Sequence, residues 1–272
     1  MSEAVGAVTQ SRPLAAMHDP KVTIVTPTLN QGEFIEATIL SVLNQTYLNV
    51  EYIIVDGGSI DKTVDIFEKY KGRFKLIQGQ DKGQTDAINI GFKAATGYLV
   101  GWLNSDDLLD PNAVELIVER FRQNPNASVY LGIARGIDEN GVVLGVPKQI
   151  PLSFENALRG IPCFSQPGSF YLKHLVEQVG YLDASLVMHM DTDLILRLTR
   201  LGKAEFIPQV LASLRRHSSS KTLTRCWDRV REGLHVRRRI GASSLVLLLI
   251  LMNYVRTLVG DDLRRRGLLY RF

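Results

Sequence analysis

Acidic residues follow three apolar stretches of the sequence, and their types and spacing suit metal and phosphate chemistry. Asp56 ends one stretch, Asp81 follows another, and Asp106 and Asp107 come after a third. Ligands of open parallel sheets bind beyond the carboxyl ends of the strands, so these carboxylates are expected at one edge. Carboxylates gathered there repel one another unless a cation lies among them. Such oxygen ligands suit Mg²⁺ or Mn²⁺ together with substrate phosphate oxygens.

The elements that must position these residues alternate between strands and helices. A β-branched run over 22–26 predicts a buried parallel strand that Pro27 stops, and Asn30 then suits the N-cap of a helix. Further strands are predicted at 52–55, 74–77 and 97–103, with helices to about Tyr70, at 84–95 and from Asp110-Pro111 onward. This alternation predicts the α/β class, with a doubly wound, mostly parallel sheet flanked by helices.

After Pro125 the pattern changes, although the same sheet is expected to continue. Runs at 129–133 and 141–144 predict two strands around a turn at 138–141, followed by a short strand at 168–172 and a helix at 191–201. The first strand is not followed by Gly-x-Gly-x-x-Gly, and the P-loop pattern ending in Gly-Lys-Ser/Thr is absent from the sequence. The usual dinucleotide-binding and P-loop classes are therefore excluded.

Composition sets the outer bounds. A chain of 272 residues with 45% hydrophobic and 22% charged residues is ordinary for a globular protein, which excludes collagen, a coiled coil and a wholly disordered chain. Cys163 and Cys226 are too few and too far apart for a disulfide framework or a zinc ribbon. Residues 1–20 lack the parts of a secretory signal, so we expect a short disordered leader and a cytoplasmic protein.

Charge is unevenly distributed along the chain. The formal net charge is +4, yet residues 215–272 hold 14 Lys and Arg against 4 Asp and Glu, so the remainder is acidic. Such a basic block can bind nucleic acid, an anionic membrane surface or an acidic partner. Nucleic acid is disfavoured because few aromatic residues, such as Trp227 and Tyr254, interleave the arginines.

The same basic region contains an apolar segment. Between Arg239 and Arg256 lie 16 uncharged residues. A helix of that length spans about 24 Å, less than the roughly 30 Å hydrocarbon core of a bilayer, so a crossing is not expected. Two alternatives remain over 240–259: a buried helix packed on the domain, or a peripheral helix in the membrane interface with arginines at both ends.

Several motifs, in their order and spacing, resemble those of the family 2 glycosyltransferases. They are Thr-Pro-Thr-Leu-Asn at 26–30, Val-Asp-Gly-Gly-Ser-Ile-Asp-Lys-Thr at 55–63 and Trp-Leu-Asn-Ser-Asp-Asp at 102–107, with further matches at 81–83, 86–89, 166–168, 180–183 and 191–198. The resemblance runs from about residue 21 to residue 221. It implies a GT-A fold over 21–222, followed by a C-terminal helical tail over 223–272.

The resemblance also implies roles on the donor side. Asp56 matches the aspartate that hydrogen-bonds the nucleobase, typically uracil, although an Asp before two glycines also suits a turn. Thr26, Pro27, Asp81 and Asp86 match positions that line the donor pocket. Asp86 has a second interpretation, because an acid in the first turn of a helix favours the helix dipole.

For the metal, Asp106 matches the last residue of the family's Asp-x-Asp motif, and His217 resembles a late histidine that completes the site, unless it is simply solvated. Asn104 stands where the motif usually has its first Asp, which removes one charge from the expected Mg²⁺ or Mn²⁺ site. Asp107 keeps three interpretations: a second ligand, a contact to the sugar or ribose, or an acid near the start of the next helix.

On the acceptor side, the resemblance makes Asp191 the general base that removes the acceptor proton in an inverting transfer. Asp191 could otherwise cap its helix. Asp193 lies two residues on, and about 200° around a helix, so only one of the two can face the substrate. Gln166 and Pro167 resemble part of the acceptor-side loop.

Two functions of different class follow from the sequence. The first is a metal-dependent transferase that moves a sugar from a nucleotide-sugar, of UDP type, to a sugar or lipid-linked acceptor in polysaccharide or lipid-glycan synthesis. The basic tail would then place it at the inner face of a membrane. The second is a catalytically silent GT-A domain that binds nucleotide or glycan as a partner module. Asn104 favours the second, whereas Asp56, Asp106 and Asp191 together favour the first.

Overall fold

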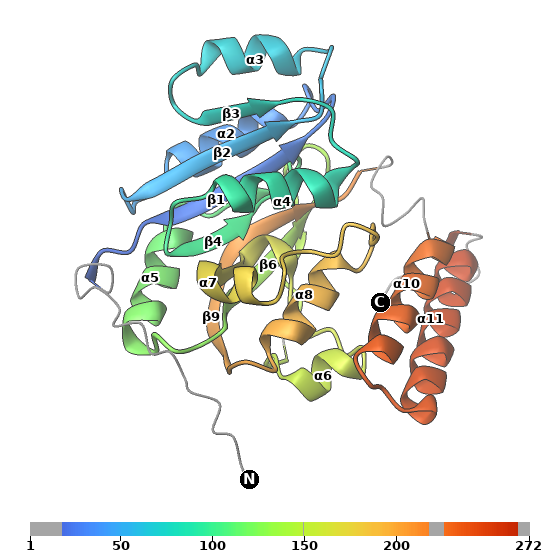
Figure 1. Cartoon of the computed structure of the whole chain (residues 1–272). Helices are drawn as coiled ribbons and strands as arrows, with labels where there is room; N and C mark the ends of the chain where they lie inside the picture. Colours follow the sequence, from blue (N-terminus) through green and yellow to red (C-terminus); the bar gives the residue numbers. More distant parts are fainter. Residues whose placement is uncertain (1–17, 149, 218–225, 266–272) are drawn as a thin grey trace.

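The computed structural model describes residues 18–148, 150–217 and 226–265 (Figure 1). At its centre lies one mixed sheet of nine strands, in which β3-β2-β1-β4-β8-β6-β9-β5 are neighbours in that order and β7 pairs with β6. The strands are β1 (Val22–Thr28), β2 (Val50–Asp56), β3 (Lys75–Gln78), β4 (Leu99–Trp102), β5 (Leu108–Leu109), β6 (Val129–Ile137), β7 (Val143–Gly145), β8 (Ser169–Leu172) and β9 (Ala204–Arg215). The α/β class and the fold expected from the sequence are confirmed.

Helices cover both faces of this sheet, since alternate residues of the buried strands point to opposite sides. On one face, α2 (Ile35–Leu43), α3 (Thr63–Lys69) and α5 (Ala113–Gln123) pack through residues such as Ile39, Phe67 and Ile117. On the other face lie α4 (Gln84–Ala94), α7 (Lys173–Gln178) and α8 (Met190–Leu198). Shorter elements are α6 (Phe154–Leu158) and the 3-10 helix η1 (Gln166–Gly168).

The sheet is mixed, whereas the sequence predicted a mostly parallel one. Strands β1 to β4 are parallel, as the βα alternation predicts, and β8 is antiparallel to both β4 and β6. The hairpin of β6 and β7 forms at the predicted turn, where Asp138 and Val142 are hydrogen-bonded and Gly141 has φ 87°. Strand β9 was not predicted from its sequence, which alternates poorly and contains Pro208; it runs parallel to β6 with register shifts.

Pro27 does not end the first strand, which continues to Thr28. The carbonyl of Val25 accepts from Leu103 on the β4 side and the carbonyl of Thr28 accepts from Gly57 on the β2 side. Because successive residues of a strand point to alternate sides, the missing N–H of Pro27 faces the β4 side. Pairing with β4 ends at Val25, so the proline removes no ladder hydrogen bond there.

Two predicted helix starts are also wrong. Asn30 is not an N-cap, because α2 begins at Ile35 and Asn30 lies in the left-handed region with φ 52°. Helix α5 begins at Ala113 after Asn112, whereas the Asp110 carboxylate pairs with Arg135 at 2.7 Å. In both cases the side chain that was expected to cap a helix interacts with a residue distant in sequence: Asn30 accepts from the amide of Ile60, and Asp110 pairs with Arg135.

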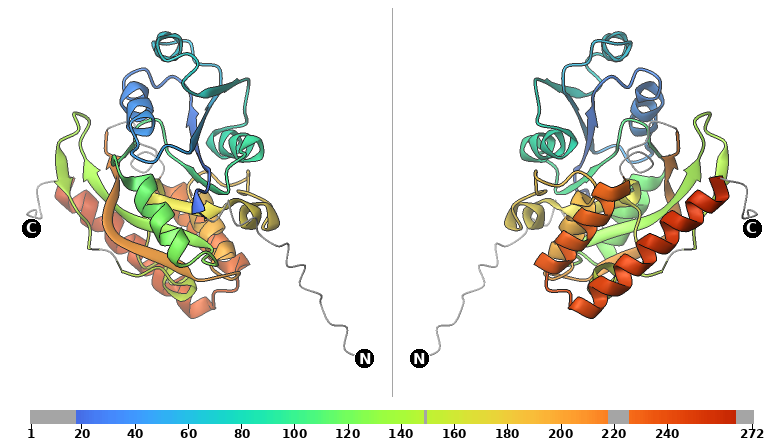
Figure 2. Two further views of the ribbon diagram at one scale, coloured as in Figure 1. Left: turned by 90° about the vertical axis from the view of Figure 1, so that its left-hand side faces the viewer. Right: turned by 90° about the vertical axis from the view of Figure 1, so that its right-hand side faces the viewer.

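The tail forms two helices, α10 (Cys226–Arg239) and α11 (Ser244–Arg265). Val236 and Ile240 join the core around α8, and Arg239 forms 2.6 Å ion pairs with Asp183 and Asp193. Figure 2 shows α11 lying along the outside of α10. Ile250 of α11 is buried, whereas Leu245, Leu248, Leu249 and Met252 are exposed. The structure is therefore compatible with both alternatives for this segment, a helix packed on the domain and a helix in the membrane interface, because one side of α11 is buried and another is exposed to solvent.

The ends of the predicted domains fall largely outside the described residues. Of the expected leader, only residues 18–20 are described, and there Tyr47 donates a 2.6 Å hydrogen bond to Asp19. The boundary expected at 222 also lies outside them. Among the described helices, none combines the length and hydropathy needed to cross a bilayer.

Candidate active site

Asp56 lies at the carboxyl end of β2, in register with Thr28 of β1 and Gln78 of β3. Its carboxylate is fully buried and accepts hydrogen bonds from the amide of Ser59 at 3.2 Å, the hydroxyl of Ser59 at 2.6 Å and the amide of Gln78 at 3.4 Å. A carboxylate offers about four acceptor sites, so capacity for a further donor remains. Of the two residues that donate to Asp56, Ser59 is buried and Gln78 is exposed.

The loop after β1 is fastened to the loop after β2. The amide of Asn30 donates to the Ser59 hydroxyl at 2.8 Å, and its side-chain oxygen accepts from the amide of Ile60 at 2.9 Å. The amide of Gln31 donates to Thr63 at 2.9 Å. The two hydrogen bonds of Asn30 explain its left-handed backbone conformation. Together with the Gln31–Thr63 bond, they join the two loops beside Asp56.

Asp81 and Asp86 lie at the same edge. The Asp81 carboxylate is 2.8 Å from the position that a Cβ on Gly57 would occupy, so a larger residue at 57 would displace the Asp81 side chain. Asp81 accepts from the amide of Gly83 at 2.8 Å, and Asp86 accepts from the amide of Lys82 at 3.1 Å. Both carboxylates are partly exposed and retain acceptor capacity toward a ligand.

Asn104 occupies the centre of a hydrogen-bond network. Its oxygen accepts from Gln84 at 2.7 Å, while its amide group donates to Asp107 at 3.1 Å and to Gln166 at 3.2 Å. Gln166 in turn donates to the carbonyl of Trp102 at 2.7 Å. An aspartate here could not donate to either partner. The asparagine therefore joins the predicted donor-side and acceptor-side loops.

Asp106 and His217 meet at 3.0 Å, between Oδ2 and Nε2. The Phe34 ring packs against the His217 ring at 4.8 Å. Two neighbouring ligands of an octahedral cation with bonds of about 2.1 Å are themselves roughly 3 Å apart, so this pair fits two positions of a Mg²⁺ or Mn²⁺ site. Within the described residues no group of three or more His, Cys, Asp or Glu could hold a metal. The remaining ligands would be water and substrate phosphate oxygens.

Arg215, at the end of β9, secures this loop, and sequence reasoning did not select it. Its amide donates to the Asp107 carboxylate and its guanidinium to the carbonyl of Asp106, both at 2.9 Å, and to the carbonyl of Glu139 at 2.8 Å. Burial and the nearby charge of Asp106 raise the pKa of Asp107 well above its ordinary value. Asp107 is enclosed by protein donors, which favours a structural role that was not among its three interpretations.

Asp191, the predicted general base, lies in the first turn of α8. Burial raises the pKa of Asp191, against the lowering effect of hydrogen bonds from Thr192 and of the Arg237 charge. A carboxylate with a raised pKa is a stronger base than an ordinary one. Asp193, in contrast, is fully buried and paired with Arg197 and Arg239. Of the two acids, Asp191 is therefore the one with capacity for a substrate proton.

The first turn of α4 connects the two halves of the site. Gln84 donates to Asn104, two residues before Asp106. The next residue, Thr85, donates to the carbonyl of Leu186 at 2.6 Å and contacts the sulfur of Met190 at 2.9 Å. Met190 precedes Asp191. Two consecutive residues, Gln84 and Thr85, thus contact the metal-side loop and the segment before the predicted base.

Stacked aromatic rings make a second connection. Trp102, just before the Asn104 loop, stacks on Tyr171 of β8 with ring centroids 5.9 Å apart. The negative charge of Asp191 contributes to raising the pKa of Tyr171, after burial. The ring pair therefore links β4, which precedes the Asn104 loop, to β8, whose Tyr171 lies close enough to Asp191 for its charge to act.

The remaining predicted residues are more enclosed. Thr26 is buried within β1 and accepts a 3.1 Å hydrogen bond from Tyr52, so its side chain faces the core. Pro27 is buried in the same strand. Pro167 is buried in η1 beside Gln166, which remains partly exposed. Gln166 is the member of this group with side-chain contacts inside the site.

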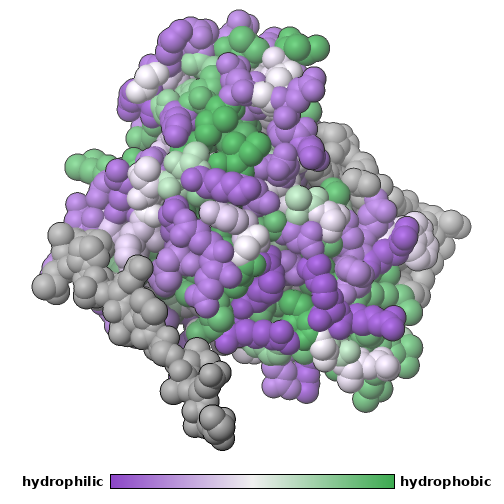
Figure 3. All heavy atoms as spheres, viewed as in Figure 1, coloured by the Kyte–Doolittle hydropathy of each residue, from purple (hydrophilic) through white to green (hydrophobic). Residues whose placement is uncertain are grey.

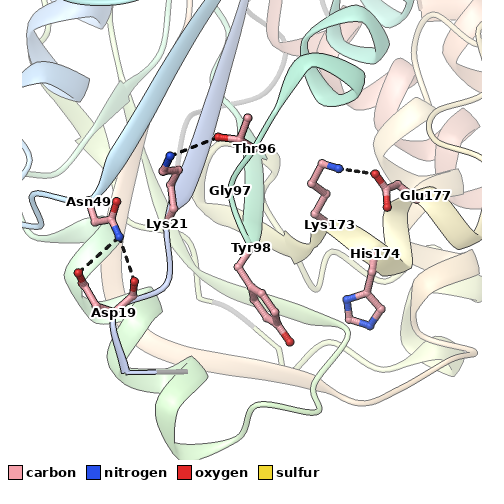
Figure 4. A pocket seen from close by; sticks show the side chains of 9 residues that line it. All are labelled: Asp19, Lys21, Asn49, Thr96, Gly97, Tyr98, Lys173, His174 and Glu177. Atoms are coloured by element: carbon pink, nitrogen blue, oxygen red, sulfur yellow. Dashed lines mark hydrogen bonds and ion pairs between the residues drawn. The ribbon is translucent and has the colours of Figure 1, made fainter. Parts of the chain in front are cut away.

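A separate cleft lies at the opposite edge of the sheet. Its volume is about 560 Å³ and its lining residues include Lys21 just before β1 and Tyr98 just before β4 (Figure 4). Lys21 donates to Thr96, and Lys173 pairs with Glu177 on α7. Lys21 and Tyr98 precede the parallel strands β1 and β4, whereas Asp56 and Asp106 lie at the carboxyl ends of β2 and β4, so the cleft is distinct from the candidate active site.

The profile of the family described as "Glycosyl transferase family 2" matches residues 23–180, more than half of the chain. The chain belongs to this family. The match contains Asp56, Asn104, Asp106 and Gln166, and it ends before Asp191.

Curated relatives agree with that membership. A chondroitin synthase of Escherichia coli is 28% identical over 194 residues, covering 70% of this chain and 28% of the synthase. A hyaluronan synthase of Pasteurella multocida is 25% identical over 256 residues, covering 92% and 24%. The chain thus spans about a quarter of the length of these synthases. An uncharacterized glycosyltransferase of Rickettsia typhi is 30% identical over 218 residues, covering 76% of this chain and 67% of that protein.

Solved structures share the fold. TarS of S. aureus in complex with UDP-GlcNAc aligns with TM-score 0.67 at 18% identity, covering 86% of this chain and 71% of that chain. A mannosyltransferase of Pyrobaculum calidifontis in complex with GDP-Man and Mn²⁺ aligns with TM-score 0.64 at 17% identity, covering 89% and 75%.

Proposed function

We propose that this protein is an inverting, metal-dependent glycosyltransferase that moves a sugar from a UDP-type nucleotide-sugar to a hydroxyl acceptor. The observation that carries the proposal is the first turn of α4, whose residues contact both the Asn104–Asp106 loop and the segment before Asp191. Family membership and the nucleotide-sugar complexes of TarS and the mannosyltransferase support a donor of this class.

On the donor side, the chain supplies positioning. Asp56, held by Ser59, accepts from the nucleobase, and Asp81 and Asp86 line the donor pocket. Asp106 and His217 would hold Mg²⁺ or Mn²⁺, which would neutralise the charge that develops on the diphosphate. Fixing the reactants in this way lowers the barrier through orientation.

On the acceptor side, Asp191 accepts the proton of the attacking hydroxyl. The hydroxyl oxygen forms a bond to the anomeric carbon while the bond from that carbon to the phosphate oxygen breaks, and its electron pair leaves with the nucleoside diphosphate. Attack opposite the leaving group inverts the configuration. Gln166 and Pro167 line the acceptor side, where Gln166 is oriented by Asn104.

The acceptor is proposed to be a growing polysaccharide or a lipid-linked glycan. The chondroitin and hyaluronan synthases among the relatives support the first. Exposed apolar residues on α11 support an acceptor at a membrane surface: Leu245, Leu248, Leu249 and Met252 recur every three or four residues and are 53–66% exposed. The face shown in Figure 3 is mainly hydrophilic, with apolar side chains at the lower right, where Figure 1 has the tail helices.

The membrane proposal is tested with vesicles of phosphatidylglycerol and of phosphatidylcholine. The full chain should sediment with the anionic vesicles, and Leu248→Glu with Met252→Glu should release it. Leu48→Glu is the matched control, because Leu48 is 92% exposed far from the tail. Equal binding by the α11 variant would contradict a membrane role for this helix.

The activity is tested with a panel of UDP- and GDP-sugars in Mn²⁺ or Mg²⁺, measuring release of the nucleoside diphosphate. Release with one donor that stops on chelation and returns with added metal supports the transferase. Tight UDP binding with no release from any donor and any glycan acceptor tested would favour the silent binding module instead.

A further inference from the structure

We propose that the C-terminal helices position the catalytic base, with Glu232 of α10 as the principal positioning residue. The inference rests on the proposed role of Asp191 and adds residues that lie beyond 180, where the match to the family profile ends. Three contacts carry it: a carboxylate that holds the segment before Asp191, a hydrogen-bond chain that ends on Asp191, and a buried arginine beside it.

Glu232 holds three consecutive backbone amides. Its carboxylate accepts from Val187 at 3.0 Å, from Met188 at 2.7 Å and from His189 at 3.1 Å. These amides lie immediately before α8, and the last of them belongs to its N-cap residue, His189, so none has a partner within the helix. Hydrogen bonds to an ionised carboxylate are roughly twice as strong as neutral ones. Because Asp191 follows two residues later, Glu232 sets where α8 begins and hence where the base lies.

A chain of side chains leads from α11 to the base. Tyr254 contacts Nε2 of His189 at 3.1 Å, Nδ1 of His189 contacts the Thr192 hydroxyl at 3.1 Å, and that hydroxyl donates to Asp191 at 3.3 Å. His189 is neutral at pH 7, since burial and then the charges of Arg237 and Arg229 lower its pKa to about 3.

The direction of this chain depends on which nitrogen of the neutral imidazole carries the proton, because a neutral imidazole has one donor and one acceptor nitrogen. With the proton on Nδ1, His189 donates to the Thr192 oxygen and Nε2 accepts from Tyr254, so Thr192 keeps its own proton for Asp191. In this tautomer every hydrogen bond points toward the Asp191 carboxylate and so favours its charged form.

Arg237 supplies a buried positive charge on the same helix as Glu232. It is 5% exposed and donates to the carbonyls of Gly233 at 3.0 Å and Ala157 at 3.3 Å. Its charge acts on Asp191 in the direction that lowers the pKa of the carboxyl. The tail thus both fixes the position of Asp191 and favours its ionised form.

The first test measures hydrogen–deuterium exchange of the full chain. In Glu232→Ala, the amides of 187–189 should exchange faster, while those of β1 and β2 stay unchanged. The matched control is Asp183→Asn, which weakens another contact of α10 with the body, the Asp183–Arg239 ion pair, without touching these amides. Unchanged exchange at 187–189 in Glu232→Ala would overturn the proposal.

The second test measures turnover with UDP-GlcNAc and GDP-mannose in Mn²⁺, and UDP binding by calorimetry. A misplacement of about 1 Å can cost on the order of 100-fold in rate, so Glu232→Ala should lose about that much in kcat with UDP affinity unchanged. Glu232→Gln, which keeps one carbonyl acceptor, should lose less and also serves if the alanine variant fails to fold. Full turnover in both variants would overturn the proposal.

Tyr254→Phe provides a readout that general loosening would not move. Removing the first donor of the chain disfavours ionised Asp191, so the acid limb of the turnover profile should shift to higher pH. An unshifted limb would contradict the role of the chain. Asp191→Asn in the same assay separates the two proposals: if it is inactive while Glu232→Ala is active, only the positioning role fails, and if it is active, the base assignment fails as well.

Discussion

Nη2 of Arg239 lies 2.6 Å from Oδ1 of Asp193, and Arg197 takes the other oxygen of the same carboxylate at 2.6 Å. Asp193 is fully buried between these two arginines. The neighbouring acid, Asp191, has no arginine hydrogen-bonded to it among the described contacts and accepts only from Thr192. The ion pairs therefore indicate a structural role for Asp193, whereas Asp191 keeps the capacity to accept a proton.

Arg239→Met should destabilise the protein without changing the site directly. One buried oxygen of Asp193 loses its partner, which costs about 1–3 kcal/mol of the free energy of unfolding. Chemical denaturation measures the loss. Arg238→Met, at an exposed neighbouring position of α10, is the control and should be close to neutral. Equal stability of the two variants would contradict a structural role for the Asp193 pair.

His189 should make stability depend on pH. Its pKa falls from an ordinary 6.5 to about 3 in the folded protein, so the unfolded chain binds more protons between these values. Stability should fall as the pH drops from 6.5 toward 3, and His189→Gln should flatten this dependence. Denaturation at several pH values measures it, with His235→Gln, at an exposed position, as control. A slope that His189→Gln leaves unchanged would show that His189 is not the group responsible.

Asn104→Asp should impair the protein although it restores the usual first residue of the family's Asp-x-Asp motif. The new carboxylate loses the donors to Asp107 and Gln166 and faces their oxygens instead. Losing these hydrogen bonds costs about 1–3 kcal/mol of stability. Thermal unfolding and turnover measure the effect. An aspartate variant that is both as stable and as active would show that the network does not require an amide.

Asp106 and His217 should govern metal affinity. His217→Ala removes one of the two proposed protein ligands, so the Mn²⁺ concentration needed for UDP binding should rise at least about tenfold. Calorimetric titration of UDP at several Mn²⁺ concentrations measures this. His174→Ala serves as control, because His174 lines the cleft at the opposite edge of the sheet. If the Mn²⁺ concentration needed for UDP binding rose in His174→Ala and not in His217→Ala, the metal site would lie elsewhere.

The alternation of apolar runs and helical patterns was enough to predict the parallel half of the sheet. Asp56 ends β2 and Asp106 follows β4. Both positions could be predicted because each strand is a short apolar run followed directly by polar residues and turn residues. Strand β9 escaped prediction, since Pro208 and weak alternation obscure it and its pairing with β6 is long-range. Asn30 and Asp110 looked like helix caps, yet distant partners took their side chains.

The tail shows a different limit of sequence reasoning. Its arginines were interpreted by charge alone, whereas Arg237 and Arg239 each have specific partners in the body. The role of Glu232 could not be predicted from the sequence. Its partners are backbone amides about 45 residues earlier, and every residue except proline has such an amide, so no residue type marks the contact. Asn104 was interpreted as a missing charge, and the structure shows that its amide group connects both loops.

The central claim is that Asp191 removes the acceptor proton in a site shared with Asp56 and Asp106. Asp191→Asn tests it most directly, with UDP binding and nucleoside diphosphate release measured side by side in Mn²⁺. The account predicts UDP affinity unchanged and turnover reduced by about 10²- to 10⁴-fold, the usual contribution of a general base. Undiminished turnover in Asp191→Asn would contradict it.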